Sequence, residues 1–96
     1  MAASVPQLVA CAIRGPILRA DLPGLCRRIC AVLDRSDAEV LLCDVSGAEP
    51  DAVTVEALAR LQLAVGRRGR RARLCFASTE LLELIEFMGL RDLVPK

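Results

Sequence analysis

The 96-residue chain has no histidine, no tryptophan and no tyrosine, and two phenylalanines are its only aromatic residues. Without histidine, the side chain that most often performs acid–base catalysis and binds metals is missing. Acid–base chemistry would fall to carboxylates, and the clustered ones, Asp44, Glu49 and Asp51, have no recognisable nucleophile beside them. Glycine-rich motifs that bind nucleotide phosphates are also missing. We expect a protein that is not an enzyme and uses no cofactor.

Long apolar runs are missing as well. No run approaches the ~20 residues of a membrane span, and the first residues lack the basic start and long apolar centre of a secretion signal. With 54% hydrophobic residues but few aromatics, the core must be built from Leu, Val, Ile, Ala and Cys. We expect one cytoplasmic domain over residues 1–96, with no insertion into a membrane.

The cysteines show no metal or disulfide pattern. The chain has five, Cys11, Cys26, Cys30, Cys43 and Cys75. An odd number without CxxC spacing argues against a disulfide framework and a zinc site. Cys26 and Cys30 share a helical face, so they could form a bridge or bind a soft metal as a pair. We favour the alternative, in which they are buried as small apolar side chains. We expect no metal site and a reducing compartment.

Hydrophobic periodicity divides the chain into alternating strands and helices. Strands are predicted at residues 8–14, 17–19, 40–45 and 73–77. Helices are predicted from Asp21 to residue 33, from Asp51 to Gly69, and from Ser78 or Thr79 to Gly89. The predicted caps at the helix starts are Asp21, Asp51 and either Ser78 or Thr79, in chain order. Gly69 and Gly89 are predicted to end the second and third helices. The remaining residues, 90–96, leave room for one short terminal element.

The element order β-β-α-β-α-β-α predicts a single α/β domain. Strands joined through helices pair in parallel, and the first two strands, joined at Gly15-Pro16, are expected to form an antiparallel hairpin. The result is a mixed sheet of four to five strands with helices packed on it. Residues 40–45 are nearly all apolar, which predicts a central strand that is covered on both faces.

Charge is unevenly distributed along the chain. Residues 34–56 carry seven acids and one arginine, whereas residues 60–73 carry six arginines and no acid. The basic cluster Arg67, Arg68, Arg70, Arg71 and Arg73 raises the alternative of RNA or acidic-lipid binding. However, no aromatic residue is interleaved for base stacking, and arginine is favoured at the carboxyl end of a helix. We favour a solvated helix end and expect no nucleic-acid partner.

The order of these segments resembles a STAS domain (sulfate transporter and anti-sigma factor antagonist). That family has an apolar strand ending in Asp, an Asp-Ser-Ser-Gly-Leu-like helix start, a Gly ending that helix, and an apolar strand followed by a Ser-capped helix ending in Gly-Leu. The corresponding segments are residues 41–44, residues 51–55, Gly69, residues 74–78 and Gly89-Leu90. The match covers most of the chain and implies the STAS fold.

The resemblance also implies a function. Small stand-alone STAS domains typically act as anti-sigma factor antagonists, which bind a serine/threonine kinase of the anti-sigma type through the start of the second helix until phosphorylation abolishes binding. The implied partner-binding residues are Glu49, Asp51, Val53, Thr54 and Val55. The alternative is a constitutive accessory subunit of a lipid-transport-like membrane complex, without phosphorylation switching. The partner's identity and the choice between monomer and weak dimer stay open.

One position departs from the family pattern. The phosphoacceptor serine of the family aligns with Val53, which has no hydroxyl. Thr54 and Ser46 are the nearest hydroxyls and are the candidate phosphoacceptors, although we interpret Thr54 and Asp51 first as helix caps. The resemblance implies that the surface around residues 53–55 is exposed, partly apolar and rimmed by acids.

Overall fold

The computed structural model describes residues 7–90 of the chain. Strands and helices alternate along it, as the sequence predicts. In chain order the elements are β1 (Leu8–Ala12), the short 3-10 helix η1 (Arg19–Asp21), α1 (Leu22–Asp34), β2 (Val40–Asp44), α2 (Ala52–Arg67), β3 (Arg71–Cys75) and α3 (Thr79–Phe87). This alternation confirms the predicted α/β class.

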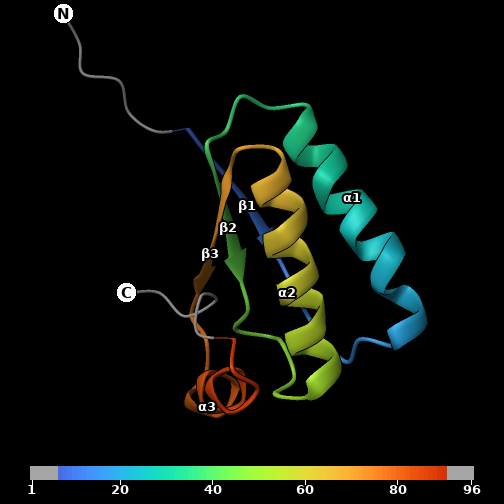
Figure 1. Cartoon of the computed structure of the whole chain (residues 1–96), viewed down its shortest axis with the longest axis vertical. Helices are drawn as coiled ribbons and strands as arrows, with labels where there is room; N and C mark the ends of the chain where they lie inside the picture. Colours follow the sequence, from blue (N-terminus) through green and yellow to red (C-terminus); the bar gives the residue numbers. More distant parts are fainter. Residues whose placement is uncertain (1–6, 91–96) are drawn as a thin grey trace, which may run out of the picture.

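The three described strands form one parallel sheet in the order β1-β2-β3 (Figure 1). β2 lies in the middle, as predicted, and each strand reaches the next through a helix because parallel neighbours need a crossover. α1 and α2 lie side by side along the sheet, while α3 lies beyond the ends of the strands. The carboxyl ends of the strands and the starts of α2 and α3 therefore meet at one edge, which we call the carboxyl edge.

The predicted hairpin at the start of the chain is wrong. Residues 17–19 form no strand, because Ile17 turns into the core and Arg19 begins η1. Beyond β1 the backbone instead continues beside the loop that follows β2, where the Gly15 amide donates to the Gly47 carbonyl at 3.1 Å. This bond extends the parallel pairing, so the chain does not fold back on β1.

The sheet is consequently smaller than predicted. Within residues 7–90 it has three parallel strands, and not the four to five strands of a mixed sheet. Residue 90 belongs to neither a helix nor a strand, and the rest of the terminal element predicted at residues 90–96 lies outside the described residues.

The helix boundaries follow the predicted capping chemistry in two cases out of three. The Asp51 carboxylate accepts a hydrogen bond from the Thr54 amide at 2.8 Å, and the Ser78 hydroxyl accepts one from the Leu81 amide at 3.1 Å. Asp21, in contrast, has helical backbone angles and makes no capping bond, because η1 leads directly into α1. The prediction that Asp21 caps α1 is therefore wrong.

Two glycines end helices as predicted. Gly69 and Gly89 have φ angles of 72° and 77°, in the left-handed region that suits glycine after a helix.

The core lies between the sheet and the two long helices. Leu41 and Cys43 of β2 point into it and are almost completely buried, together with Leu58, Leu61 and other apolar residues of α2. On the opposite face of the sheet, alternate residues such as Leu42 stay partly exposed. Within the described residues β2 is thus covered on one face, and the predicted cover on both faces is not present.

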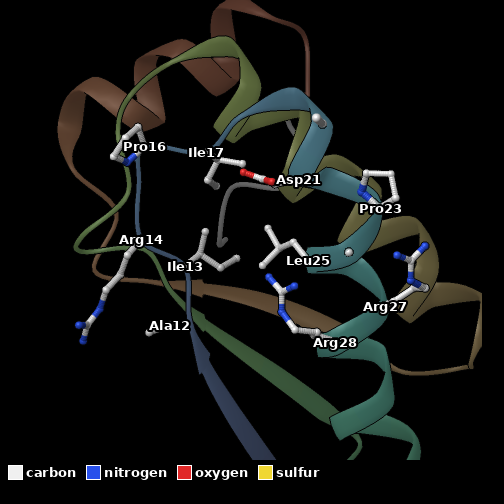
Figure 2. A pocket seen from close by; sticks show the side chains of 12 residues that line it. Ala12, Ile13, Arg14, Pro16, Ile17, Asp21, Pro23, Leu25, Arg27 and Arg28 are labelled. Carbon is white, nitrogen blue, oxygen red and sulfur yellow. The ribbon is translucent and has the colours of Figure 1, made fainter.

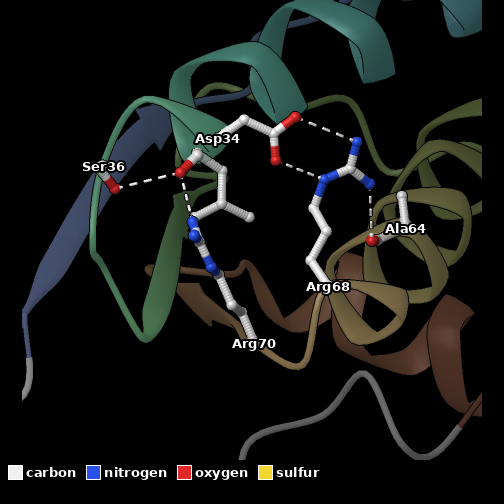
Figure 3. Close-up of polar contacts among 6 residues, drawn as sticks. Asp34, Ser36, Ala64, Arg68 and Arg70 are labelled. Atoms are coloured by element: carbon white, nitrogen blue, oxygen red, sulfur yellow. Dashed lines mark hydrogen bonds and ion pairs between the residues drawn. The ribbon is translucent and has the colours of Figure 1, made fainter.

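Arginines near the end of α2 join the two long helices (Figure 3). The Arg68 guanidinium donates to both carboxylate oxygens of Asp34, at 2.8 and 3.3 Å, and to the Ala64 carbonyl at 3.0 Å. Arg70 donates to the Leu33 carbonyl at the end of α1. Two members of the basic cluster therefore hold α1 and α2 together, which argues against a cluster whose arginines are all free for nucleic acid.

Candidate functional site

The carboxyl edge is built from three loops that bond to one another. The Gly15 amide reaches the Gly47 carbonyl, and the Val45 amide donates to the Cys75 carbonyl at 3.0 Å. A Cβ at position 15 would lie only 2.8 Å from the Glu49 side chain and 3.0 Å from its backbone nitrogen, so this position requires glycine. The loops therefore form one connected surface.

Ser46 and Asp44 are paired at this edge. The Ser46 amide donates to the Asp44 carboxylate at 3.0 Å. The Ser46 hydroxyl and amide, helped by the charge of Arg14, hold the pKa of Asp44 below its usual range. Asp44 is consequently ionised at neutral pH, and the exposed Ser46 hydroxyl has a carboxylate beside it.

The start of α2 is packed inside the molecule, contrary to expectation. Thr54 and Val55 are each 0% exposed. Their burial follows from helical spacing, because both lie on the stripe that continues through Leu58 and Leu61. The predicted exposed surface around residues 53–55 is therefore wrong for two of its three residues, and only Val53 is partly exposed.

Thr54 is also not a cap. Its amide is the group that Asp51 caps, and its hydroxyl oxygen has no hydrogen-bond partner within the described part of the chain. Of the two candidate phosphoacceptors, a kinase could reach only Ser46 in the folded molecule, because the Thr54 hydroxyl is enclosed by the core.

The remaining predicted partner-binding residues stay at the surface. Glu49 is exposed and Asp51 is partly exposed, with its carboxylate engaged as the cap of α2. They flank Pro50 in the loop that leads into α2, and Pro50 lines a surface that the sequence prediction missed.

That surface is a shallow groove between the start of α2 and α3. It is lined by Pro50, Glu80, Glu83, Leu84 and Phe87, and we call it the α2–α3 groove. Phe87 is 87% exposed, and the two glutamates border it. A signal was present in the sequence, because Phe87 falls outside the stripe of Leu81, Leu84 and Ile85 on α3.

The other phenylalanine is exposed too. The predicted strand at residues 73–77 ends at Cys75, and Phe76 follows it with φ of 61° and 77% of its surface exposed. A left-handed conformation is unfavourable for a residue with a Cβ and often marks a functional position. Both aromatic residues of the chain are thus presented to solvent.

Residues 7–90 contain no group of three or more potential ligands that could hold a metal. Their five cysteines are free thiols, and the sulfurs of Cys11 and Cys43 approach to 4.0 Å. The hydrogen bond from Cys11, together with burial, raises the pKa of the Cys43 thiol, which favours its neutral form. This pair contributes to packing under the helices.

None of the helices described between residues 7 and 90 has the length and apolar character needed to cross a bilayer.

Comparison with known proteins supports the fold. The sequence matches no protein-family model and no curated protein. Among solved structures, the chain is similar to a sulfate transporter family protein from Wolinella succinogenes, with a TM-score of 0.67 and 22% sequence identity. The similarity covers 96% of this chain and 76% of that one. At this identity it shows a shared fold, and it is consistent with the STAS-like fold that the sequence predicts.

Proposed function

We propose that this chain is a non-catalytic, regulatory protein-interaction module of the STAS type, which binds a protein partner at its carboxyl edge. The fold similarity to a sulfate transporter family protein supports the STAS type. The observation that carries the docking proposal is Phe87, 87% exposed in a groove with Leu84 and Pro50 beside the start of α2. Exposed aromatic side chains that stand beside other apolar side chains are typical anchors of protein interfaces.

The groove indicates the chemistry of the partner. Glu80 and Glu83 border the apolar floor, and Glu49 is exposed in the nearby loop. A complementary partner offers an apolar pocket for Phe87 with basic side chains around it, because opposite charges at the rim steer association and fix its register. From the family resemblance, that partner is an anti-sigma factor of the kinase type or a related signalling protein.

A phosphorylation switch on this module would act at Ser46 and not at Thr54. Ser46 is exposed, whereas Thr54 is fully buried. A phosphate adds about 1.5 to 2 negative charges at neutral pH. On Ser46 that charge would meet the ionised Asp44 and disturb the bonded loops of the carboxyl edge.

The second candidate is a constitutive accessory subunit of a membrane transport complex. It is favoured by Val53, which stands without a hydroxyl where the STAS family carries its phosphoacceptor. Incubation with a cognate kinase followed by mass spectrometry separates the two: stoichiometric phosphate on Ser46 supports switching, and unmodified protein supports fixed docking.

The docking surface is tested with purified partners of both classes from the same organism, using titration calorimetry. We expect Phe87→Ala to weaken binding by about 10-fold or more, as the loss of an interface anchor does. Leu63→Ala is the matched control, because Leu63 is also an exposed apolar residue on a helix but lies outside the groove. Equal affinities of the wild type and Phe87→Ala for a partner that binds would rule out the groove.

A further inference from the structure

A second hollow, which shares no lining residue with the α2–α3 groove, lies between the end of β1 and the start of α1 (Figure 2). Its volume is about 820 Å³, within the range of small-molecule sites. The apolar side chains of Ile13, Ile17 and Leu25 line it, the first two of them buried in the core. The hollow therefore has a firm apolar floor.

Arginines supply the polar part of the lining. Arg27 and Arg28 of α1 line the hollow with a single acid, Asp21, while the side chain of Arg14 extends away from it (Figure 2), so the lining carries a net positive charge. Figure 2 shows the Arg28 guanidinium directed over the floor toward Leu25. No ion pair of Arg27 or Arg28 occurs within residues 7–90.

Two of these arginines converge on Gly24. The point where a Cβ of Gly24 would sit lies 3.4 Å from Nη1 of Arg28 and 3.9 Å from Nη2 of Arg27. Two like charges near one point repel each other, and an anion placed between them replaces repulsion with attraction. Guanidinium groups match the geometry of phosphate and carboxylate oxygens. Glycine leaves this space open.

We propose that this hollow binds an amphiphilic anion. Its phosphate or carboxylate head lies between Arg27 and Arg28 above Gly24, and its apolar part lies along Leu25, over the buried Ile13. The site uses none of the residues of the α2–α3 groove. The proposal therefore goes beyond the proposed docking function and is tested independently of it.

The ligand class is tested with four probes: hexyl phosphate, hexanoate, inorganic phosphate and hexanol. Binding is measured by calorimetry and by the NMR shift of the Gly24 amide. We expect hexyl phosphate or hexanoate to bind about 10-fold more tightly than both inorganic phosphate and hexanol, since each single-feature probe loses one half of the contacts. Inorganic phosphate binding as tightly as hexyl phosphate, or no shift with any probe, overturns the proposal.

The position of the head is tested with Gly24→Glu. The new carboxylate lies four residues before Arg28 on the helix, where it pairs with the guanidinium and occupies the place of the anion. We expect an unchanged or higher Tm, because glycine is unfavourable within a helix, and a loss of hexyl phosphate binding of about 10-fold or more.

Gly66→Glu is the matched control, because Gly66 also lies in a helix but, its chain neighbours and its own helix backbone aside, no atom lies within 4 Å of its Cβ position. It is expected to bind hexyl phosphate as the wild type does. Full binding by Gly24→Glu, or equal losses in both variants, would contradict the proposed site.

Discussion

Thr54→Val tests the burial of an unpaired hydroxyl at the start of α2. Thr54 is 0% exposed and its hydroxyl oxygen has no hydrogen-bond partner in the described part of the molecule. In proteins, burying such a group costs about 1 to 3 kcal/mol, and valine has nearly the same shape without the polar atom. Thr and Val also have similar helix propensities, so helix propensity contributes little to the difference in stability between the two proteins.

We therefore expect Thr54→Val to raise the free energy of unfolding by about 1 to 2 kcal/mol. For a domain of this size each kcal/mol corresponds to a Tm increase of about 4 to 8 °C. Unfolding in urea, followed by far-UV circular dichroism because the chain has no tryptophan, measures the change. Thr79→Val, at an exposed position in the first turn of α3, is the control and should stay within about 0.5 kcal/mol of the wild type.

A Thr54→Val variant about 1 kcal/mol less stable than the wild type would refute this reasoning, because it would mean that the hydroxyl has a partner in solution.

The same burial determines how Thr54→Glu must be interpreted. Burying an unpaired carboxylate costs several kcal/mol, so this variant is expected to unfold the helix start rather than imitate a phosphate. Lost binding by Thr54→Glu would then report unfolding and not a switch.

Three further changes test contacts elsewhere in the fold. Gly15→Ala should lower stability by about 1 to 3 kcal/mol in urea unfolding, since its Cβ would collide with Glu49. Phe76→Gly should raise stability by about 1 kcal/mol by removing left-handed strain, and a loss would indicate contacts of the ring that outweigh it. Arg68→Gln should destabilise at neutral pH. Arg68 lowers the pKa of Asp34 in the folded state, so this difference is present above the unfolded pKa of about 4 and disappears as acid protonates the folded carboxylate.

Local chemistry in the sequence was sufficient for most elements. Asp51, Ser78, Gly69 and Gly89 act through residues within four positions along the chain, and their predicted roles are confirmed. The predicted hairpin at the start of the chain is wrong because the structure there depends on a contact that is distant in the sequence. The path that the chain takes after β1 depends on a hydrogen bond between Gly15 and a loop about thirty residues later, and no local sequence pattern predicts that bond.

The candidate site was predicted less well than the fold. The burial of Thr54 follows from its spacing to Leu58 and Leu61, but the capping preference of threonine favours the opposite interpretation, an exposed helix start. The α2–α3 groove requires Pro50 and Phe87 to meet from different elements, which depends on where α3 lies against α2. The sequence pattern is sufficient to recognise Phe87 as exposed, but it does not show that Pro50 lies beside it.

The buried helix start changes where regulation can act on this module. A capped first turn whose Thr54 and Val55 are enclosed by the core offers a partner little more than Val53 and the loop before it. Under the proposed function, recognition then depends on the loop that holds Ser46 and on α3, which carries Phe87. Since that loop is bonded to both neighbouring strand ends, a charge added within it affects all three loops of the carboxyl edge together. The proposed function therefore places binding and switching on the loop and α3, while the start of α2 packs into the core.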